Sequence, residues 1–138
     1  MQPGAEVPPI ACSDRDTGAV AATQANAERA GVQALLEVRE HAVTAQPWLQ
    51  PGGAPPRGVV ATNPPYGMRV KGKSQLLPLY QTLGHRVRQL DEDWRAAIVA
   101  HDVRLARRTG LPLEPAFTTR HGGLSVTAMT TPTPAEDS

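Results

Sequence analysis

Residues 58–67 read GVVATNPPYG and combine a short strand with a rigid turn. The first five residues are small or β-branched, which is typical of a strand buried on both faces in a parallel sheet. Asn63-Pro64-Pro65-Tyr66 follows at once and therefore lies at the carboxyl end of that strand. Open α/β sheets bind their ligands at this end, so the stretch predicts both a fold class and the place of a site.

Predicted strands and helices alternate around this stretch. Helices are expected from an N-cap at Asp16 to a stop at Gly31, from a cap at Ser74, and after Asp102. Strands are expected at residues 9–13, 34–39, 58–62 and 94–100, followed by a hairpin at residues 116–129. The second helix has an apolar stripe with three- and four-residue steps: Leu76, Leu79, Tyr80, Leu83, Val87 and Leu90. The order predicts an α/β fold with a largely parallel sheet and a carboxyl-terminal antiparallel hairpin.

Composition excludes several classes of protein. With 138 residues and Cys12 as the only cysteine, the chain has one domain's length and no internal disulfide framework or multi-cysteine zinc site. No apolar run is long enough for a membrane helix, and the four histidines share no metal-ligand spacing. We therefore expect a soluble, cytoplasmic protein with no metal and no membrane partner, and an aliphatic core.

Charge is unevenly distributed along the chain. Residues 1–56 carry a net charge of −3, residues 57–108 carry +6 and residues 109–138 carry −2. The basic middle section is typical either of a surface that faces a polyanion or of a solvated surface, and charge alone leaves both open.

The turn after the strand has residues suited to holding a planar amine. The Asn63 side-chain carbonyl can accept one hydrogen of an exocyclic amino group, and the backbone carbonyl of Pro64 can accept the other. Two prolines stiffen the turn, and Tyr66 offers a flat face on which a base can stack. The alternative is an ordinary proline-rich turn, which the whole string VVATNPPYG makes less favourable.

The string GVVATNPPYGMRV resembles the catalytic motif of class I S-adenosylmethionine-dependent methyltransferases that modify exocyclic amines. More narrowly, the chain is similar to bacterial 23S ribosomal RNA guanine-N2 methyltransferases, whose catalytic domain usually follows a THUMP domain. ACSDRD, AVAATQANAERAGV, LYQTLGHRVRQL, WRAAIVAHD and HGGLSV continue the resemblance, which runs from about Ile10 to about Met129. It implies a Rossmann-like methyltransferase sheet and S-adenosylmethionine as the cofactor.

The resemblance also implies roles for individual residues. Asp14 matches the acid that binds the cofactor's ribose hydroxyls, with helix capping as its alternative role, and Arg15 would lie beside the adenine. Glu40 falls near the place of an acid that binds the adenine amine, although a solvated glutamate fits too. Asn63, Pro64, Pro65 and Tyr66 take the catalytic positions, and Asn63 also lies next to the cofactor. Arg69, Lys71 and Lys73 would bind RNA phosphates, or form a solvated basic loop.

The chain departs from the family pattern at its start. Nothing in residues 1–10 matches the family's first strand and glycine-rich cofactor loop, and we expect no THUMP domain within the 138 residues. In the family's sheet the missing strand lies between the strand ending at Asp14 and the strand ending at Asn63. The expected organisation is a disordered or truncated start at residues 1–8, a partial catalytic domain at residues 9–130 and a disordered tail at residues 131–138.

Three functions follow from this interpretation. The first is methyl transfer to a guanine amine of ribosomal RNA. In this case the isolated fragment either lacks activity or is completed by a complementary chain that supplies the missing strand. The second is a non-catalytic remnant that binds RNA or a partner chain. The third is methylation of adenine in DNA, because the NPPY motif also serves that chemistry.

Overall fold

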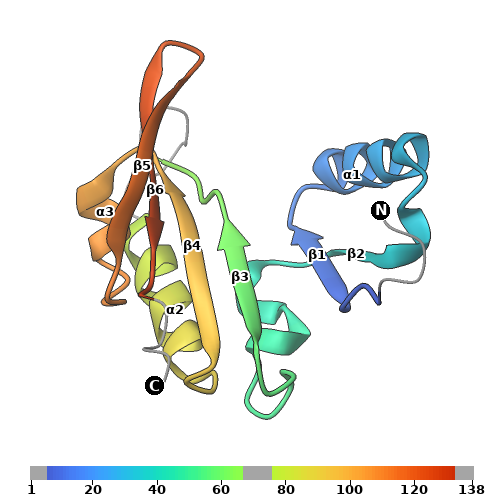
Figure 1. Ribbon diagram of the computed structural model, residues 1–138, viewed down its shortest axis with the longest axis horizontal. Coiled ribbons are helices and arrows are strands. Elements are labelled where there is room, and N and C mark those ends of the chain that lie inside the picture. The colour runs from blue at the N-terminus through green and yellow to red at the C-terminus, as the bar shows by residue number, and fades with distance from the viewer. Residues whose placement is uncertain (1–5, 67–75, 133–138) are drawn as a thin grey trace. The chain divides into compact units, whose positions relative to one another are not determined.

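The computed structural model describes residues 6–66 and 76–132. The chain divides into two compact units, Met1–Gln46 and Pro47–Ser138, and each is described by itself. Figure 1 shows both units as mixtures of helices and strands. No helix of the described residues is long and apolar enough to cross a membrane. The α/β class and the carboxyl-terminal hairpin of the sequence prediction are confirmed.

The first unit is a strand-helix-strand motif. β1 (Ile10–Asp14) and β2 (Leu36–Glu40) pair in parallel, and α1 (Thr17–Ala30) connects them. The Asp16 carboxylate accepts a hydrogen bond from the Ala19 amide at 2.8 Å, and Gly31 ends the helix with a φ of 73°. Both ends of this helix are therefore where the sequence predicts them, because capping is decided by local residues.

Both predicted strands of this unit begin one or two residues later than expected. β1 begins at Ile10 instead of residue 9 and ends at Asp14, which pairs with Glu40. β2 begins at Leu36 instead of residue 34, because Gln33–Leu35 forms a 3-10 turn. Cys12 of β1 is half-buried.

The second unit is a four-stranded sheet with two helices. Its elements are β3 (Gly58–Thr62), α2 (Leu76–Arg88), β4 (Trp94–Ala100), α3 (Val103–Arg107), β5 (Glu114–His121) and β6 (Leu124–Thr130). A short 3-10 turn, Pro47–Leu49, precedes β3 in this unit, and another, Val43–Ala45, follows β2 in the first unit. The strand order is β3-β4-β6-β5, with β3 parallel to β4 and the hairpin strands antiparallel. Among the described residues, two strand pairs are parallel, β1-β2 and β3-β4, and two are antiparallel, β4-β6 and β5-β6.

The core of the second unit lies between the sheet and the helices. Figure 1 shows α2 and α3 on one side of the sheet. Ile98 of β4 and Met129 of β6 are 2% and 0% exposed. Of the predicted apolar stripe, Leu79 and Leu90 are half-buried and the other four residues are buried: Leu76, Tyr80, Leu83 and Val87. α2 passes so close to the chain after α3 that a Cβ on Gly84 would lie 1.8 Å from the Thr109 carbonyl oxygen.

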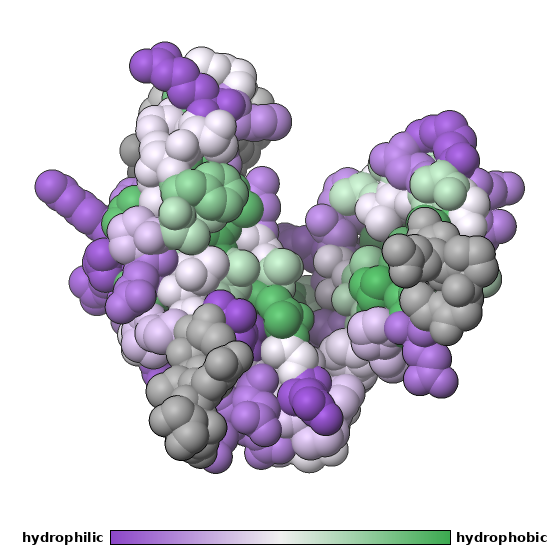
Figure 2. Space-filling model, in the orientation of Figure 1, coloured by the Kyte–Doolittle hydropathy of each residue, from purple (hydrophilic) through white to green (hydrophobic). Residues whose placement is uncertain are grey.

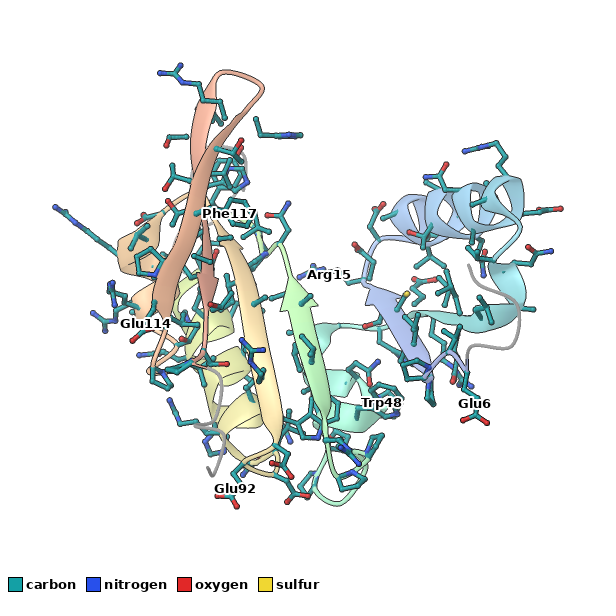
Figure 3. All side chains as sticks on the ribbon, in the orientation of Figure 1. Glu6, Arg15, Trp48, Glu92, Glu114 and Phe117 are labelled. Carbon is teal, nitrogen blue, oxygen red and sulfur yellow. The ribbon has the colours of Figure 1, made fainter. Side chains whose placement is uncertain are left out.

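Apolar side chains are also exposed on the sheet. Val59 of β3 and Phe117 of β5 are each 63% exposed, and Val99 of β4 is 39% exposed. Figure 2 shows hydrophobic surface over these strands, and Figure 3 shows Phe117 on the hairpin. The prediction that β3 is buried on both faces is therefore wrong for the described residues, since Val59 and Ala61 are exposed.

Candidate functional site

The NPPY turn begins where β3 ends. Thr62 is the last residue of β3 and pairs with Ile98 of β4, so the turn starts at the carboxyl end of a parallel strand pair. The Asn63 side chain is exposed, Pro64 is buried and Tyr66 is half-buried. Pro64 therefore anchors the turn in the core, and the Asn63 side chain remains accessible from solution.

Tyr80 fastens this turn from α2. Its phenol hydroxyl donates a hydrogen bond to the Pro65 carbonyl oxygen at 2.8 Å. The Tyr80 side chain is 3% exposed, so little water competes for this bond. The sequence placed Tyr80 in the buried stripe and missed its link to the turn. The signal was available in principle, because a buried tyrosine needs a partner for its hydroxyl.

Tyr80 keeps its proton well beyond the physiological range. Burial, and secondarily the negative charge of Asp102, raises the pKa of Tyr80 to about 12. Both effects disfavour the phenolate. The hydroxyl therefore remains a hydrogen-bond donor to Pro65 at every pH at which the protein would work.

The Tyr66 ring stacks on the His101 ring. The ring centroids lie 3.9 Å apart and the planes differ by 16°. His101 is the residue directly after β4, and parallel pairing brings the carboxyl ends of β3 and β4 to the same edge. The sequence interpretation gave Tyr66 a stacking role and gave His101 none, because the contact depends on the pairing of the two strands.

Two carboxylates of the first unit lie side by side. Asp14 and Glu40 end β1 and β2 and are partners in the parallel register. Asp14 accepts a hydrogen bond from the Asp16 amide at 2.8 Å, and Glu40 accepts one from the Thr17 hydroxyl at 3.2 Å. Both side chains are exposed, so each carboxylate retains lone pairs for other donors. The two carboxylates can accept hydrogen bonds from vicinal hydroxyls or from an amine. The Thr17 hydroxyl positions the Glu40 side chain, a contact that was not predicted from the sequence.

The remaining predicted residues divide into two groups. Arg15 follows β1 and is exposed, and Figure 3 shows it at the end of that strand. The predicted RNA-binding residues Arg69, Lys71 and Lys73 lie outside the described residues. Within residues 6–66 and 76–132, no three His, Cys, Asp or Glu side chains gather in a way that could hold a metal ion.

Comparison with known proteins identifies the family. The model of UPF0020, the RMKL-like methyltransferase domain, matches residues 2–127. The chain belongs to this methyltransferase family. The expected family resemblance and the methyltransferase fold are thereby confirmed.

Curated relatives of this methyltransferase domain are much longer proteins. The "Ribosomal RNA large subunit methyltransferase K/L" of Chromohalobacter salexigens is 37% identical over 89% of the chain and 16% of the relative. The protein of the same name from Legionella pneumophila (strain Lens) is 39% identical over 81% of the chain and 15% of the relative. The chain thus spans about one sixth of the length of the curated relatives that it matches.

Solved structures share the fold. A possible methylase from Clostridium difficile 630 matches with a TM-score of 0.79 at 25% identity, over 94% of this chain and 33% of that chain. SMU.472, crystallised in complex with SAH, matches with a TM-score of 0.77 at 21% identity, over 91% of this chain and 32% of that one. The methyltransferase family to which this chain belongs uses S-adenosylmethionine, as predicted.

Proposed function

We propose that this chain carries the amine-binding half of a ribosomal RNA methyltransferase that acts on N2 of guanine. The observation that carries the proposal is the braced turn at the end of β3, with Asn63 exposed, Pro64 buried and the Pro65 carbonyl held by Tyr80. Curated relatives named as ribosomal RNA large subunit methyltransferases support RNA as the substrate and a cytoplasmic location.

Asn63 and Pro64 would orient the target nitrogen. An exocyclic amine has two hydrogens, and acceptors at the Asn63 side-chain carbonyl and the Pro64 backbone carbonyl would hold both. The nitrogen lone pair is then directed out of the base plane, and Tyr66 supports the flat base. The proton released on methylation can pass to solvent, because Asn63 is exposed. The chain would contribute by orienting the target amine toward the methyl group, and no covalent intermediate with the protein would form.

Asp14 and Glu40 would hold the cofactor. Their exposed carboxylates, paired at the ends of β1 and β2, suit the ribose hydroxyls and the adenine amine of S-adenosylmethionine. When bound, S-adenosylmethionine supplies an electrophilic methyl group. Arg15, exposed at the same end of β1, is proposed to flank the adenine, and Arg69, Lys71 and Lys73 are proposed to bind RNA phosphates.

Methyl transfer to unmodified 23S ribosomal RNA tests the proposal. Asn63→Ala should lower kcat about 100-fold, the order expected when one preorganised polar contact to the reacting group is lost. Cofactor affinity should stay within about twofold, since Asp14 and Glu40 remain. Asn26→Ala, the same change at an exposed position of α1, is the matched control and should leave both values unchanged. Equal rates for Asn63→Ala and the unaltered chain would refute the proposed role of Asn63.

We further propose that the catalytic unit at residues 9–130 is completed by a strand from another segment or chain. Among the described residues, β1 pairs only with β2 and β3 pairs only with β4, so each strand has an open edge. Unpaired strand edges favour the addition of another strand. Calorimetry with S-adenosylmethionine distinguishes the cases: micromolar affinity of the chain alone would argue against a need for completion and against a non-catalytic remnant.

A further inference from the structure

The stack between His101 and Tyr66 has a direct consequence for how a base can approach. A planar ring has two faces, and His101 covers one face of Tyr66 at a centroid distance of 3.9 Å. Tyr66 is half-buried, so part of its surface remains accessible. An incoming base that stacks on Tyr66 must therefore use the face opposite His101.

We propose that His101 is a positioning residue that fixes the Tyr66 ring and restricts the target base to one face of it. The inference rests on the proposed function and adds a specificity element to it. Tyr66 belongs to a turn whose backbone Tyr80 holds at Pro65, and the stack fixes the side chain of the next residue. Backbone and ring are thus both ordered before any base arrives, which lowers the entropy lost on binding.

The contact with Tyr66 depends on the flat shape of the His101 ring. It does not depend on the capacity of the imidazole to carry a proton. The Nδ1 atom of His101 is buried and has no hydrogen-bond partner among residues 6–66 and 76–132. The ring is therefore held by packing on Tyr66 and by its place after β4. A phenyl ring should replace it, because stacking needs only a planar aromatic surface and phenylalanine removes the buried unpaired nitrogen.

Nuclear magnetic resonance can observe the stack directly. The chain has only two tyrosines, so tyrosine labelling gives two sets of ring signals, and Tyr66→Phe identifies those of Tyr66. We expect nuclear Overhauser effects between the rings of Tyr66 and His101 in the unliganded chain. Titration with guanosine, the nucleoside that carries the proposed target amine, then measures binding through the Tyr66 signals.

Three variants separate positioning from folding and from proton transfer. His101→Ala should weaken guanosine binding roughly three- to tenfold, the range that loss of one aromatic pair produces. It should also raise the KM for ribosomal RNA by a similar factor, with a smaller effect on kcat. His101→Phe should restore both constants to within about twofold of the unaltered chain. His85→Ala, at an exposed position of α2, is the matched histidine control and should change neither.

The outcomes are distinct. Absence of the ring-to-ring effects, or equal guanosine affinity in His101→Ala and the unaltered chain, would overturn the inference. Equal loss in His101→Phe and His101→Ala would also overturn it, because the imidazole nitrogens would then be required. If the unaltered chain does not bind guanosine at all, the proposed amine-binding role of the turn itself fails. That result is distinct from failure of the inference, because it is seen with the unaltered chain before any variant is measured.

Discussion

Tyr80→Phe tests whether the NPPY turn is braced from α2. The substitution removes one oxygen atom and with it the 2.8 Å hydrogen bond to the Pro65 carbonyl, and it leaves the buried ring in place. A hydrogen bond of this kind contributes about 0.5–1.5 kcal/mol, and a buried carbonyl left unpaired costs about 1–3 kcal/mol. Pro65 is exposed as a residue, so water can reach its carbonyl once the phenol has gone. We therefore expect a loss of about 1 kcal/mol in the free energy of unfolding.

Urea denaturation followed by tryptophan fluorescence measures this loss. Both tryptophans, Trp48 and Trp94, lie in the second unit, so the signal reports on the unit that contains Tyr80. With a urea dependence of about 2 kcal/mol per molar, the midpoint should fall by about 0.5 M. Methyl transfer should slow about tenfold, because the turn that orients the amine becomes looser.

Thr118→Val is the matched control for loss of a hydroxyl. Its hydrogen bond to Thr127, at 3.2 Å, is exposed on the hairpin and should contribute less than about 0.5 kcal/mol. An unchanged midpoint and an unchanged rate in Tyr80→Phe would refute the bracing of the turn by Tyr80. A loss of stability with an unchanged rate would show that the bond stabilises the fold without positioning the amine.

The remaining predictions concern pH, helix packing and the carboxylate pair. The pKa of the Tyr80 hydroxyl is about 12 in the folded chain and near 10 in the unfolded chain. The contribution of Tyr80 to stability is therefore complete below pH 10 and is lost as the pH rises to 12. The difference in the free energy of unfolding between Tyr80→Phe and the unaltered chain should accordingly be constant from about pH 6 to 9. Gly84→Ala should cost about 2–3 kcal/mol in urea denaturation, because its Cβ would meet the Thr109 carbonyl at 1.8 Å. Asp14→Asn keeps an acceptor for the Asp16 amide and removes the negative charge. Calorimetry should therefore show that S-adenosylmethionine binds about tenfold more weakly. The control Glu28→Gln, at an exposed position of α1, should leave this affinity unchanged.

Features that depend on neighbouring residues could be predicted from the sequence. Asp16 and Gly31 cap α1 as expected, and β3 and β4 have the predicted bounds, because these elements are set by local residues and by apolar runs. The position of Asn63 at the end of β3 follows from the strand that precedes it. These predictions required no knowledge of which elements pack together.

Features that depend on tertiary packing could not be predicted. The bond from Tyr80 to Pro65 spans 15 residues and exists because α2 packs beside the end of β3. The His101 stack requires that β3 and β4 pair in parallel, because only then do their carboxyl ends lie at the same edge of the sheet. The exposure of Val59 also depends on tertiary packing. The small and β-branched residues of β3 predict a buried strand, but they do not show which other residues cover each face.

The groups proposed for the two halves of the reaction lie on different units, and this makes their contributions experimentally separable. Asp14, Glu40 and Thr17 belong to Met1–Gln46, whereas the turn at Asn63 and its supports belong to Pro47–Ser138. Tyr80 and His101 both follow the turn in the sequence and come from α2 and the end of β4, so the amine-binding turn is ordered by contacts within one unit. Changes in the first unit should therefore alter cofactor affinity and leave base binding unchanged, whereas changes at Tyr80 or His101 should alter base binding and leave cofactor affinity unchanged. A double variant, Asp14→Asn with His101→Ala, should show additive losses, and a strong departure from additivity would contradict this division of roles.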